Sequence, residues 1–232
     1  MIKLQNVTKI YHSHSLNGSS NIALDNVSFE VKEGEFVSIV GKSGAGKTTL
    51  TKLILRLERP SAGEIFFGGK NINTLDGIEL QQLRRKIGVV YQDYKLLPTK
   101  TVYENVAYIL QVEGKENEEV AEQVPQVLQA IGLENRFDSF PRELSGGEQQ
   151  RLAIARAVVN HPNLILADEP TGNLDPYNTY EVISILEKLN SNGKTVILLT
   201  HDREIVNKLG RRVITIDNGR IVRDEEKGAF FI

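Results

Sequence analysis

The feature that most constrains this chain is a glycine-rich run, Gly41 to Thr48, which reads GKSGAGKT. It follows an apolar stretch with the length of a buried strand, Phe36 to Val40, and it precedes a helical stretch, Thr49 to Leu57. Glycines let consecutive backbone N–H groups wrap a phosphate at a helix N-terminus, where the helix dipole also favours negative charge. Lys47 suits β- and γ-phosphate oxygens, and the Thr48 hydroxyl suits Mg²⁺. The run therefore predicts a strand-loop-helix unit that binds a nucleoside triphosphate.

A second apolar stretch, Leu164 to Ala167, ends in Asp168 and Glu169. Because the carboxyl ends of parallel strands meet at one edge of a sheet, we expect both carboxylates beside the glycine-rich loop. Asp168 is the candidate metal ligand. Glu169 is the candidate general base for an attacking water, a role that contributes about 10²–10⁴ in rate. Taken alone, such a pair is also common at an ordinary strand end.

Apolar periodicity predicts the order of the elements. The first third has strand patterns at Ile2 to Ile10 and Ala23 to Val31. Beyond Gly41, helices alternate with short apolar strands at Ile87 to Tyr91 and Thr195 to Thr200. This alternation favours βαβ units and a parallel sheet. A final hairpin is expected to turn at Asn218-Gly219, a dipeptide suited to a type I′ turn.

Residues 93–144 show no strand pattern. Val102 to Val112 and Glu116 to Ile131 are helical in pattern, and Pro125 should kink or split the second helix. We therefore expect one domain over residues 1–232, with a core of 1–92 and 145–232 and an inserted helical subdomain of 93–144. The polar loop His12 to Asn21 is expected to be a surface connection.

Composition excludes several classes of protein. The 30 acidic and 28 basic residues give a net charge of -2, which offers no broad basic surface for a nucleic-acid partner. The chain has no cysteine, so disulfides and thiolate metal sites are absent. There is no apolar stretch of signal-peptide or membrane-spanning length, so we expect a cytoplasmic protein.

The run Leu144 to Gln150, LSGGEQQ, opens a further helix. Ser145 and Glu148 have the spacing of a capping box, and a well-capped helix without any ligand is one interpretation. Gly146 and Gly147 directly after the cap would expose backbone N–H groups, as a second phosphate-binding helix end requires.

With this run, the sequence resembles the ATP-binding cassette (ABC) ATPases over nearly the whole chain. The resemblance implies an α/β fold with a P-loop NTPase core, an N-terminal antiparallel β subdomain and the inserted helical subdomain. It also implies that Tyr11 stacks on adenine, that Gln92 meets Mg²⁺ and the attacking water, and that His201 contacts the γ-phosphate. Asn173 to Asp175 would form a loop crossing a dimer interface.

The candidate residues fall into three groups. The catalytic candidates are Lys47, Gln92, Glu169 and His201. The nucleotide-binding candidates are Tyr11, Gly41, Lys42, Ser43, Gly44, Ala45, Gly46, Lys47, Thr48, Thr49, Ser145, Gly146, Gly147, Glu148 and Asp175. The metal candidates are Thr48, Gln92 and Asp168, and the expected cofactors are ATP and Mg²⁺.

The resemblance also implies partners. In such ATPases two subunits pair head to tail, so Ser145 of one subunit would face the glycine-rich loop of the other. An integral membrane protein is expected to dock near Tyr94 and the helical subdomain, which would place the chain at the inner face of the cell membrane through that partner.

Five segments resemble the bacterial cell-division members of the family most. They are Gly44 to Lys47, Tyr91 to Pro98, Thr101 to Ala107, Ala167 to Pro176 and Arg223 to Gly228. In those members the membrane partner controls peptidoglycan hydrolysis. Lys42 and the long loop His12 to Asn21 depart from that pattern. ATPases of lipoprotein release, macrolide efflux or amino-acid import remain alternatives. A soluble ABC protein without a membrane partner is a further one, although the chain has a single cassette and no heptad run.

Overall fold

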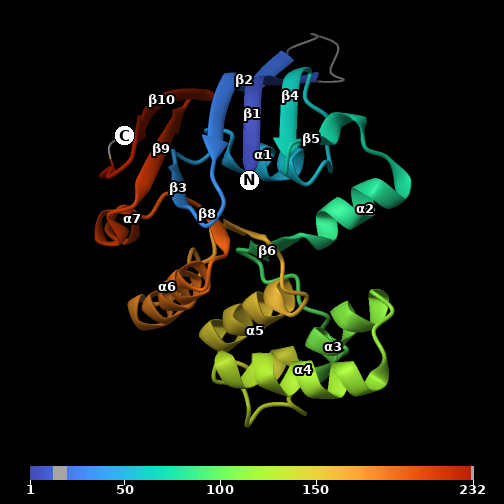
Figure 1. The fold of residues 1–232 in the computed structure, drawn as a ribbon. Helices are drawn as coiled ribbons and strands as arrows, with labels where there is room; N and C mark the ends of the chain where they lie inside the picture. The colour runs from blue at the N-terminus through green and yellow to red at the C-terminus, as the bar shows by residue number, and fades with distance from the viewer. Residues whose placement is uncertain (13–19, 231–232) are drawn as a thin grey trace.

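The computed structural model describes residues 1–12 and 20–230. Two sheets occupy the upper part of Figure 1, and helices α3 to α6 lie below them. The smaller sheet has the strand order β2-β1-β4-β5, and its paired strands are antiparallel. Its strands are β1 (Ile2–His12), β2 (Ser20–Val31), β4 (Ala62–Phe67) and β5 (Lys70–Asn71). The expected N-terminal antiparallel sheet is therefore present.

The larger sheet has the order β10-β9-β3-β8-β7-β6, with parallel pairing from β9 to β6 and an antiparallel β10 at one edge. Its strands are β3 (Phe36–Val40), β6 (Ile87–Tyr91), β7 (Leu164–Asp168), β8 (Thr195–Thr200), β9 (Arg212–Asp217) and β10 (Arg220–Glu225). Asn218 and Gly219 join β9 to β10 with φ of 48° and 76°. These positive values fit the expected type I′ turn.

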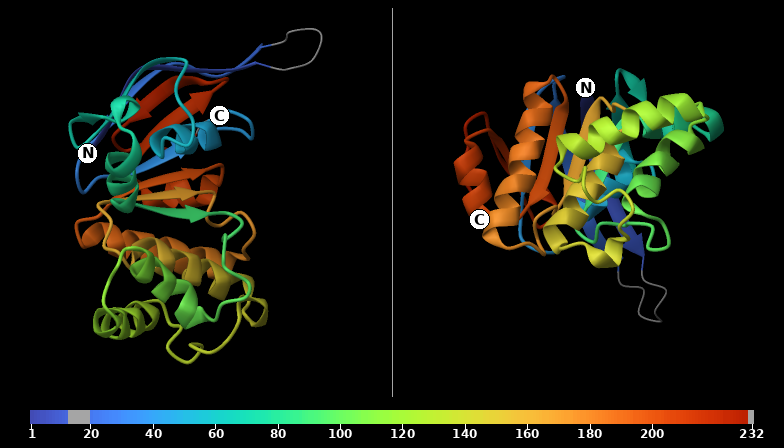
Figure 2. Two further views of the ribbon diagram at one scale, coloured as in Figure 1. Left: turned by 90° about the vertical axis from the view of Figure 1, so that its right-hand side faces the viewer. Right: turned by 90° about the horizontal axis from the view of Figure 1, so that it is seen from below.

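The helices cover the larger sheet on both faces. They are α1 (Lys47–Ile54), α2 (Gly77–Arg85), α3 (Val102–Val112), α4 (Asn117–Ala130), α5 (Gly146–Val158), α6 (Pro176–Ser191) and α7 (Arg203–Leu209). Short 3₁₀ turns lie at Ile72–Thr74 and Pro141–Glu143. Figure 2 shows the layers from the side, with α1 between the two sheets and α5 and α6 below the larger one.

Alternate residues of the central strands face two different apolar clusters. Leu164 and Leu166 pack toward α1 and the smaller sheet, whereas Ile165 and Ala167 pack toward α5, α6 and α7. A parallel strand covered on both faces is apolar at every position. This arrangement explains why the strands before the two carboxylates and the glycine-rich loop are continuous apolar runs.

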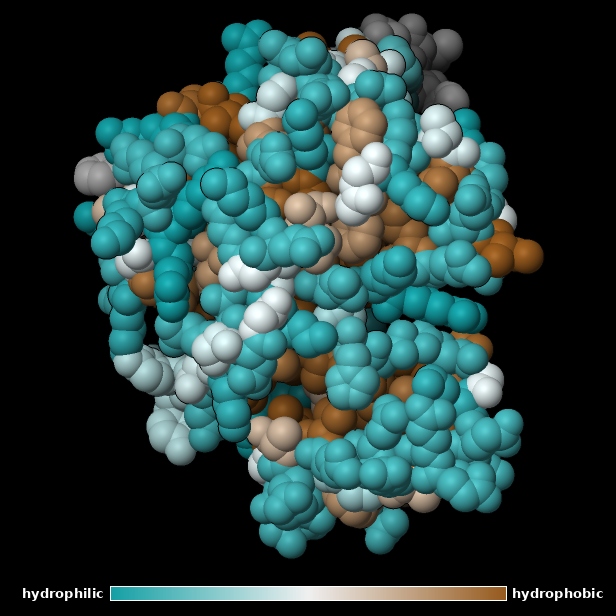
Figure 3. Space-filling view, in the orientation of Figure 1, coloured by the Kyte–Doolittle hydropathy of each residue, from teal (hydrophilic) through white to brown (hydrophobic). Residues whose placement is uncertain are grey.

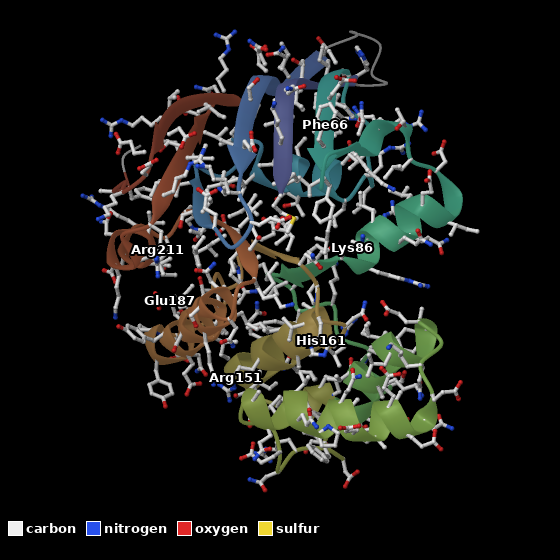
Figure 4. The ribbon with its side chains drawn as sticks, in the orientation of Figure 1. Phe66, Lys86, Arg151, His161, Glu187 and Arg211 are labelled. Carbon is white, nitrogen blue, oxygen red and sulfur yellow. The ribbon has the colours of Figure 1, made fainter. Side chains whose placement is uncertain are left out.

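Helices α3 and α4 build a third cluster together with α5. Asn105 of α3 is fully buried, and its side chain bonds the backbone of Leu97, Lys100 and Thr101. Arg151 of α5, labelled in Figure 4, pairs with Glu181 of α6, so this cluster is tied to the core.

One expectation is wrong, two elements were not predicted, and part of a further expectation lies outside the described residues. Pro125 does not split its helix, because α4 runs unbroken through it. The carbonyl four residues earlier belongs to exposed Ala121, which water can satisfy. The sequence did not predict β4 or α2, and α2 buries only Leu83, so its pattern is weak. The expected surface loop is narrower than His12 to Asn21, and residues 13–19 lie outside the described part.

Within residues 1–12 and 20–230, no helix combines the length and apolarity needed to cross a lipid bilayer.

Candidate nucleotide-binding site

The glycine-rich loop connects the end of β3 to the start of α1. Gly46 is the N-cap of α1 with φ 108°, and a Cβ there would lie 2.5 Å from the Ala23 carbonyl oxygen. A glycine is therefore required at this position. Among the described residues, no side chain caps this helix end, and its first turn holds no acidic residue. The N-terminal amides of α1 and its dipole are thus left for an anionic ligand.

Lys47, Glu169 and His201 meet at the carboxyl edge of the larger sheet. The Lys47 side chain is 6% exposed, and its Nζ lies 3.3 Å from Glu169 Oε1. The other carboxylate oxygen of Glu169 lies 2.9 Å from His201 Nδ1. Lys47 Nζ also donates to the Gly41 and Lys42 carbonyls at 2.6 and 3.2 Å. The structure therefore brings three of the four catalytic candidates together, with Glu169 bridging the other two.

Glu169 is aimed by a turn directly after β7. Its φ is 50°, and its N–H donates to the Leu199 carbonyl at 2.8 Å. Left-handed backbone is uncommon for a residue with a side chain and persists only where its surroundings enforce it. The turn separates the Glu169 carboxylate from that of Asp168, so the two neighbours can serve different tasks.

Asp168 provides a free oxygen for a metal. Its Oδ1 is buried and has no hydrogen-bond partner among the described residues. Burial raises the pKa of Asp168, the Glu169 charge adds to the rise, and the Thr51 hydroxyl opposes it. A buried carboxylate oxygen without a partner is costly unless a cation or ligand reaches it. This orphaned atom fits a cation.

The other metal candidates are also oxygen donors. A threonine hydroxyl, a carboxylate and an amide oxygen are the hard ligands that Mg²⁺ prefers. The described residues contain no group of three or more His, Cys, Asp or Glu that could hold a metal alone. A magnesium ion here would rely on phosphate oxygens and water as well, as is usual at nucleotide sites. The donor set therefore fits Mg²⁺ bound together with a nucleotide.

Gln92 follows β6 and lies in the same cleft. The cleft is lined by Thr48, Thr51, Lys52, Leu57, Tyr91, Gln92, Asp93, Lys95, Asp168, Glu169 and Asn173. Gln92 Nε2 donates to Asn173 Oδ1 at 3.4 Å, and Asn173 Nδ2 donates to the Gln92 carbonyl at 3.2 Å. The sequence places Asn173 in the loop expected at a dimer interface and does not predict its contact with Gln92, because the two residues lie 81 positions apart. All three metal candidates and two catalytic candidates, Gln92 and Glu169, thus line one cleft. Lys47 and His201 each contact Glu169.

The described contacts of Tyr11 lie away from the glycine-rich loop. It lies half-buried on β1, where the Lys9 ammonium is 4.9 Å from its ring centroid and its hydroxyl bonds Glu58. These contacts do not involve the loop of residues 41–48. Adenine stacking by Tyr11 stays a prediction.

The LSGGEQQ run forms the start of α5. Ser145 Oγ accepts from the Glu148 N–H at 3.3 Å, and a Glu148 carboxylate oxygen accepts from the Ser145 N–H at 2.8 Å. This confirms the capping box. A Cβ on Gly146 would lie 3.3 Å from the Tyr94 hydroxyl and 3.6 Å from Leu174, so the turn contacts these segments of its own chain. The structure does not show Ser145, Gly146, Gly147 or Glu148 in contact with the glycine-rich loop of the same chain.

Asp175 caps the next helix. Its Oδ1 accepts from the Tyr177 and Asn178 N–H groups at 2.9 and 3.1 Å. The pKa of Asp175 is lowered, chiefly by a hydrogen bond from the Asn178 side chain. Asp175 and Pro176 therefore form an ordinary helix start, and the dimer-interface role stays a prediction.

A parallel sheet, a glycine-rich loop on a helix N-terminus and paired carboxylates at the same edge define a P-loop nucleotide-binding domain. The family described as ABC transporter matches residues 24–172. The chain belongs to this family, whose ATPases bind ATP.

Individual relatives agree with this assignment. The chain is 48% identical to the cell division ATP-binding protein FtsE of Streptococcus pneumoniae, over 99% of this chain and 97% of that protein. It is 43% identical to the methionine import ATP-binding protein MetN 1 of Listeria monocytogenes, over 96% of this chain and 65% of that protein. A solved structure, the dimeric ATP-binding cassette MJ0796 bound to ADP and Pi, superposes with a TM-score of 0.88 at 41% identity, over 99% of this chain and 100% of that one. The expected fold class is thereby confirmed.

Proposed function

We propose that the chain is the ATP-hydrolysing subunit of a bacterial cell-division complex. It would drive an integral membrane protein that resembles FtsX, the membrane partner of FtsE. The observation that carries the proposal is the similarity to FtsE over almost the full length of both chains. The importer MetN 1 is less similar, and this chain spans only 65% of it. Through its partner, the protein would act at the inner face of the cell membrane to control peptidoglycan hydrolysis.

In the proposed reaction, the open N-terminus of α1 and Lys47 bind the phosphates of ATP. Incoming phosphate oxygens compete for Lys47 Nζ with the Gly41 and Lys42 carbonyls and with Glu169. Glu169 then orients a water and accepts its proton, while His201 holds the second carboxylate oxygen. Thr48, Asp168 and Gln92 would hold Mg²⁺, which supplies charge neutralisation for the transferring phosphoryl group.

We also propose a head-to-tail homodimer in which each ATP lies between Lys47 of one copy and Ser145 of the other. The similarity to the MJ0796 cassette, whose structure is dimeric, supports a dimer. The start of α5 contacts Tyr94 and Leu174 of its own chain, and Gly146 carries no side chain that would obstruct an incoming phosphate. In this view, residues 1–92 and 145–232 form the core, and residues 93–144 form the subdomain that carries force.

The membrane partner is proposed to dock in the groove between α2, β6, α3 and α5. Its lining includes Tyr94, Lys95, Tyr108, Val112 and Arg156. Figure 3 shows apolar side chains in a hollow between the upper part of the molecule and the helices below. Tyr108 is 45% exposed and Val112 is 61% exposed, so an apolar face of a short partner helix could cover them.

Tyr103 does not line this groove. Its ring packs against Phe137 at 6.1 Å between centroids. Thr101 caps the start of α3. The Val102 and Tyr103 N–H groups donate to the Ser139 and Phe137 carbonyls, so this end of the helix lies against that segment. Leu96 packs against the α3 and α4 cluster.

Co-expression with the FtsX-type protein of the same genome tests the proposal. Substituting Tyr108→Asp or Tyr94→Asp places a charge in the groove and should abolish co-purification, with ATP binding retained. The matched control is Tyr180→Asp, since Tyr180 is 54% exposed on α6 outside the groove. If the chain associates stably with a methionine permease and not with the FtsX-type protein, its function is import and not cell division. Unchanged co-purification of both groove variants would move the docking surface elsewhere.

A further inference from the structure

The Asn173 side chain bonds both the side chain and the backbone of Gln92. The Asn173 side-chain oxygen accepts from the Gln92 side-chain amide at 3.4 Å, and the Asn173 side-chain nitrogen donates to the Gln92 backbone carbonyl at 3.2 Å. Gly172 makes the approach possible, because a Cβ there would lie 2.8 Å from Gln92 Nε2. Only a side chain with both an acceptor and a donor can make this pair of bonds, and an amide supplies both.

Gln92 needs such a restraint because the chain beside it is irregular. Gln92 is exposed after the end of β6, and Tyr94 and Lys95 follow with φ of 58° and 52°. A flexible side chain at the edge of a strained turn would sample many rotamers. Holding it in one orientation before the substrate arrives removes an entropic cost from the reaction.

Asn173 itself lies on a stiff connection that begins at Glu169. The Gly172 N–H donates to the Glu169 carbonyl at 3.2 Å, and the Leu174 N–H donates to the Thr171 carbonyl at 3.1 Å. The connection ends where Asp175 caps α6. Gln92 is therefore held by the same stretch of backbone that carries Glu169, the candidate base.

We propose that Asn173 is a positioning residue for ATP hydrolysis, which acts by fixing Gln92 in the cleft shared with Glu169. This rests on the proposed ATPase function and adds a residue to it. Asn173 acts through Gln92 alone, so its loss should affect turnover only while Gln92 is present.

The test is a double-mutant cycle of Asn173→Ala and Gln92→Ala, with ATP turnover and ATP affinity measured on the purified chain. Asn173→Ala should lower kcat roughly tenfold, the size expected for lost hydrogen bonds, and should leave ATP affinity within about twofold. In the Gln92→Ala background, the same substitution should change kcat by less than about twofold. The control is Asn190→Ala, which removes amide bonds to the Gly34 and Lys194 carbonyls outside the cleft and should leave kcat unchanged.

The side-chain amide signal of Gln92, assigned by its loss in Gln92→Ala, reports the clamp by NMR without any turnover. It should shift and exchange faster in Asn173→Ala and stay unchanged in Asn190→Ala. An unchanged signal, or an equal loss of kcat in both backgrounds, would overturn the proposal. A further outcome is a parental chain that shows no turnover although the Gln92 amide signal shifts in Asn173→Ala as expected. That result would confirm the contact between Asn173 and Gln92 but refute the proposed ATPase function and, with it, the positioning role.

Discussion

The N-termini of α1 and α5 both follow the pattern of a phosphate-binding helix end, but they are capped differently. Gly46 caps α1 without any side-chain bond, and the first turn of α1 has no acid among the described residues. At α5, Ser145 and Glu148 bond each other's backbone N–H groups, and Arg136 lies 3.3 Å from Glu148. The end of α1 is therefore open, whereas α5 has a satisfied end, in which the Ser145 and Glu148 N–H groups are bonded within the same chain.

This difference separates two tasks. An open end with Lys47 beside it can bind phosphate within a single chain. A satisfied end with an acidic residue gains little from a phosphate unless a second surface presents that phosphate to it. In the proposed dimer, ATP affinity then belongs to α1, and the closing contact between two copies belongs to α5.

The largest expected effect comes from Glu169→Gln, which should capture the state in which both helix ends meet one ATP. The amide keeps the shape of Glu169 but cannot accept the proton of water, so turnover should fall by about 10²–10⁴ while ATP binding persists. Size-exclusion chromatography with ATP should then show a dimer. Glu187→Gln, exposed on α6, is the control. Turnover near the parental rate in Glu169→Gln would show that another group is the base.

The next effect concerns the open end alone. Gly46→Ala should destabilise the chain by roughly 2–4 kcal/mol, because the new Cβ meets both a positive φ and the Ala23 carbonyl. Gly193→Ala is the matched control, since Gly193 has φ +86° with nothing within 4 Å of the added atom. It should cost only about 1–2 kcal/mol in urea unfolding. Equal losses in the two variants would mean that the contact with Ala23 does not constrain the loop.

The smallest effect concerns the satisfied end. Ser145→Ala should lower the free energy of unfolding by about 1 kcal/mol through loss of the cap, without changing the ATP affinity of the single chain. Thr101→Ala removes the same kind of capping box from α3 and should cost a similar amount. Calorimetry gives the stability, and titration with a non-hydrolysable ATP analogue gives the affinity. A weaker affinity in Ser145→Ala alone would assign α5 to ATP binding within one chain.

Local signals in the sequence predicted local structure well. The glycine-rich loop, the capping box at Ser145 and the turn at Asn218-Gly219 each depend on a few adjacent residues, and each has the expected geometry. The apolar strands were predicted because burial on both faces makes them continuous. The unbroken α4 differed from expectation, since solvent exposure at Ala121 is a property of the fold and not of the local pattern.

Contacts between distant segments could not be predicted in this way. Strand β4 is specified by its pairing with β1, and α2 by one buried leucine. The Gln92–Asn173 pair and the bridge from Lys47 through Glu169 to His201 depend on how β6, β7 and β8 end beside one another. The sequence supplied the residue types, and the sheet order brought them together.

The central claim is that each ATP site is built from two copies of this chain. It is tested most directly by mixing Ser145→Arg with Lys47→Ala, each of which should be inactive alone. A mixed dimer keeps one site with both Lys47 and Ser145 intact. With random pairing, half of the dimers are mixed and half of their sites are intact, so turnover should return to about one quarter of the parental value. No turnover above that of the separate variants, with mixed dimers demonstrated by tagged co-purification, would contradict the account.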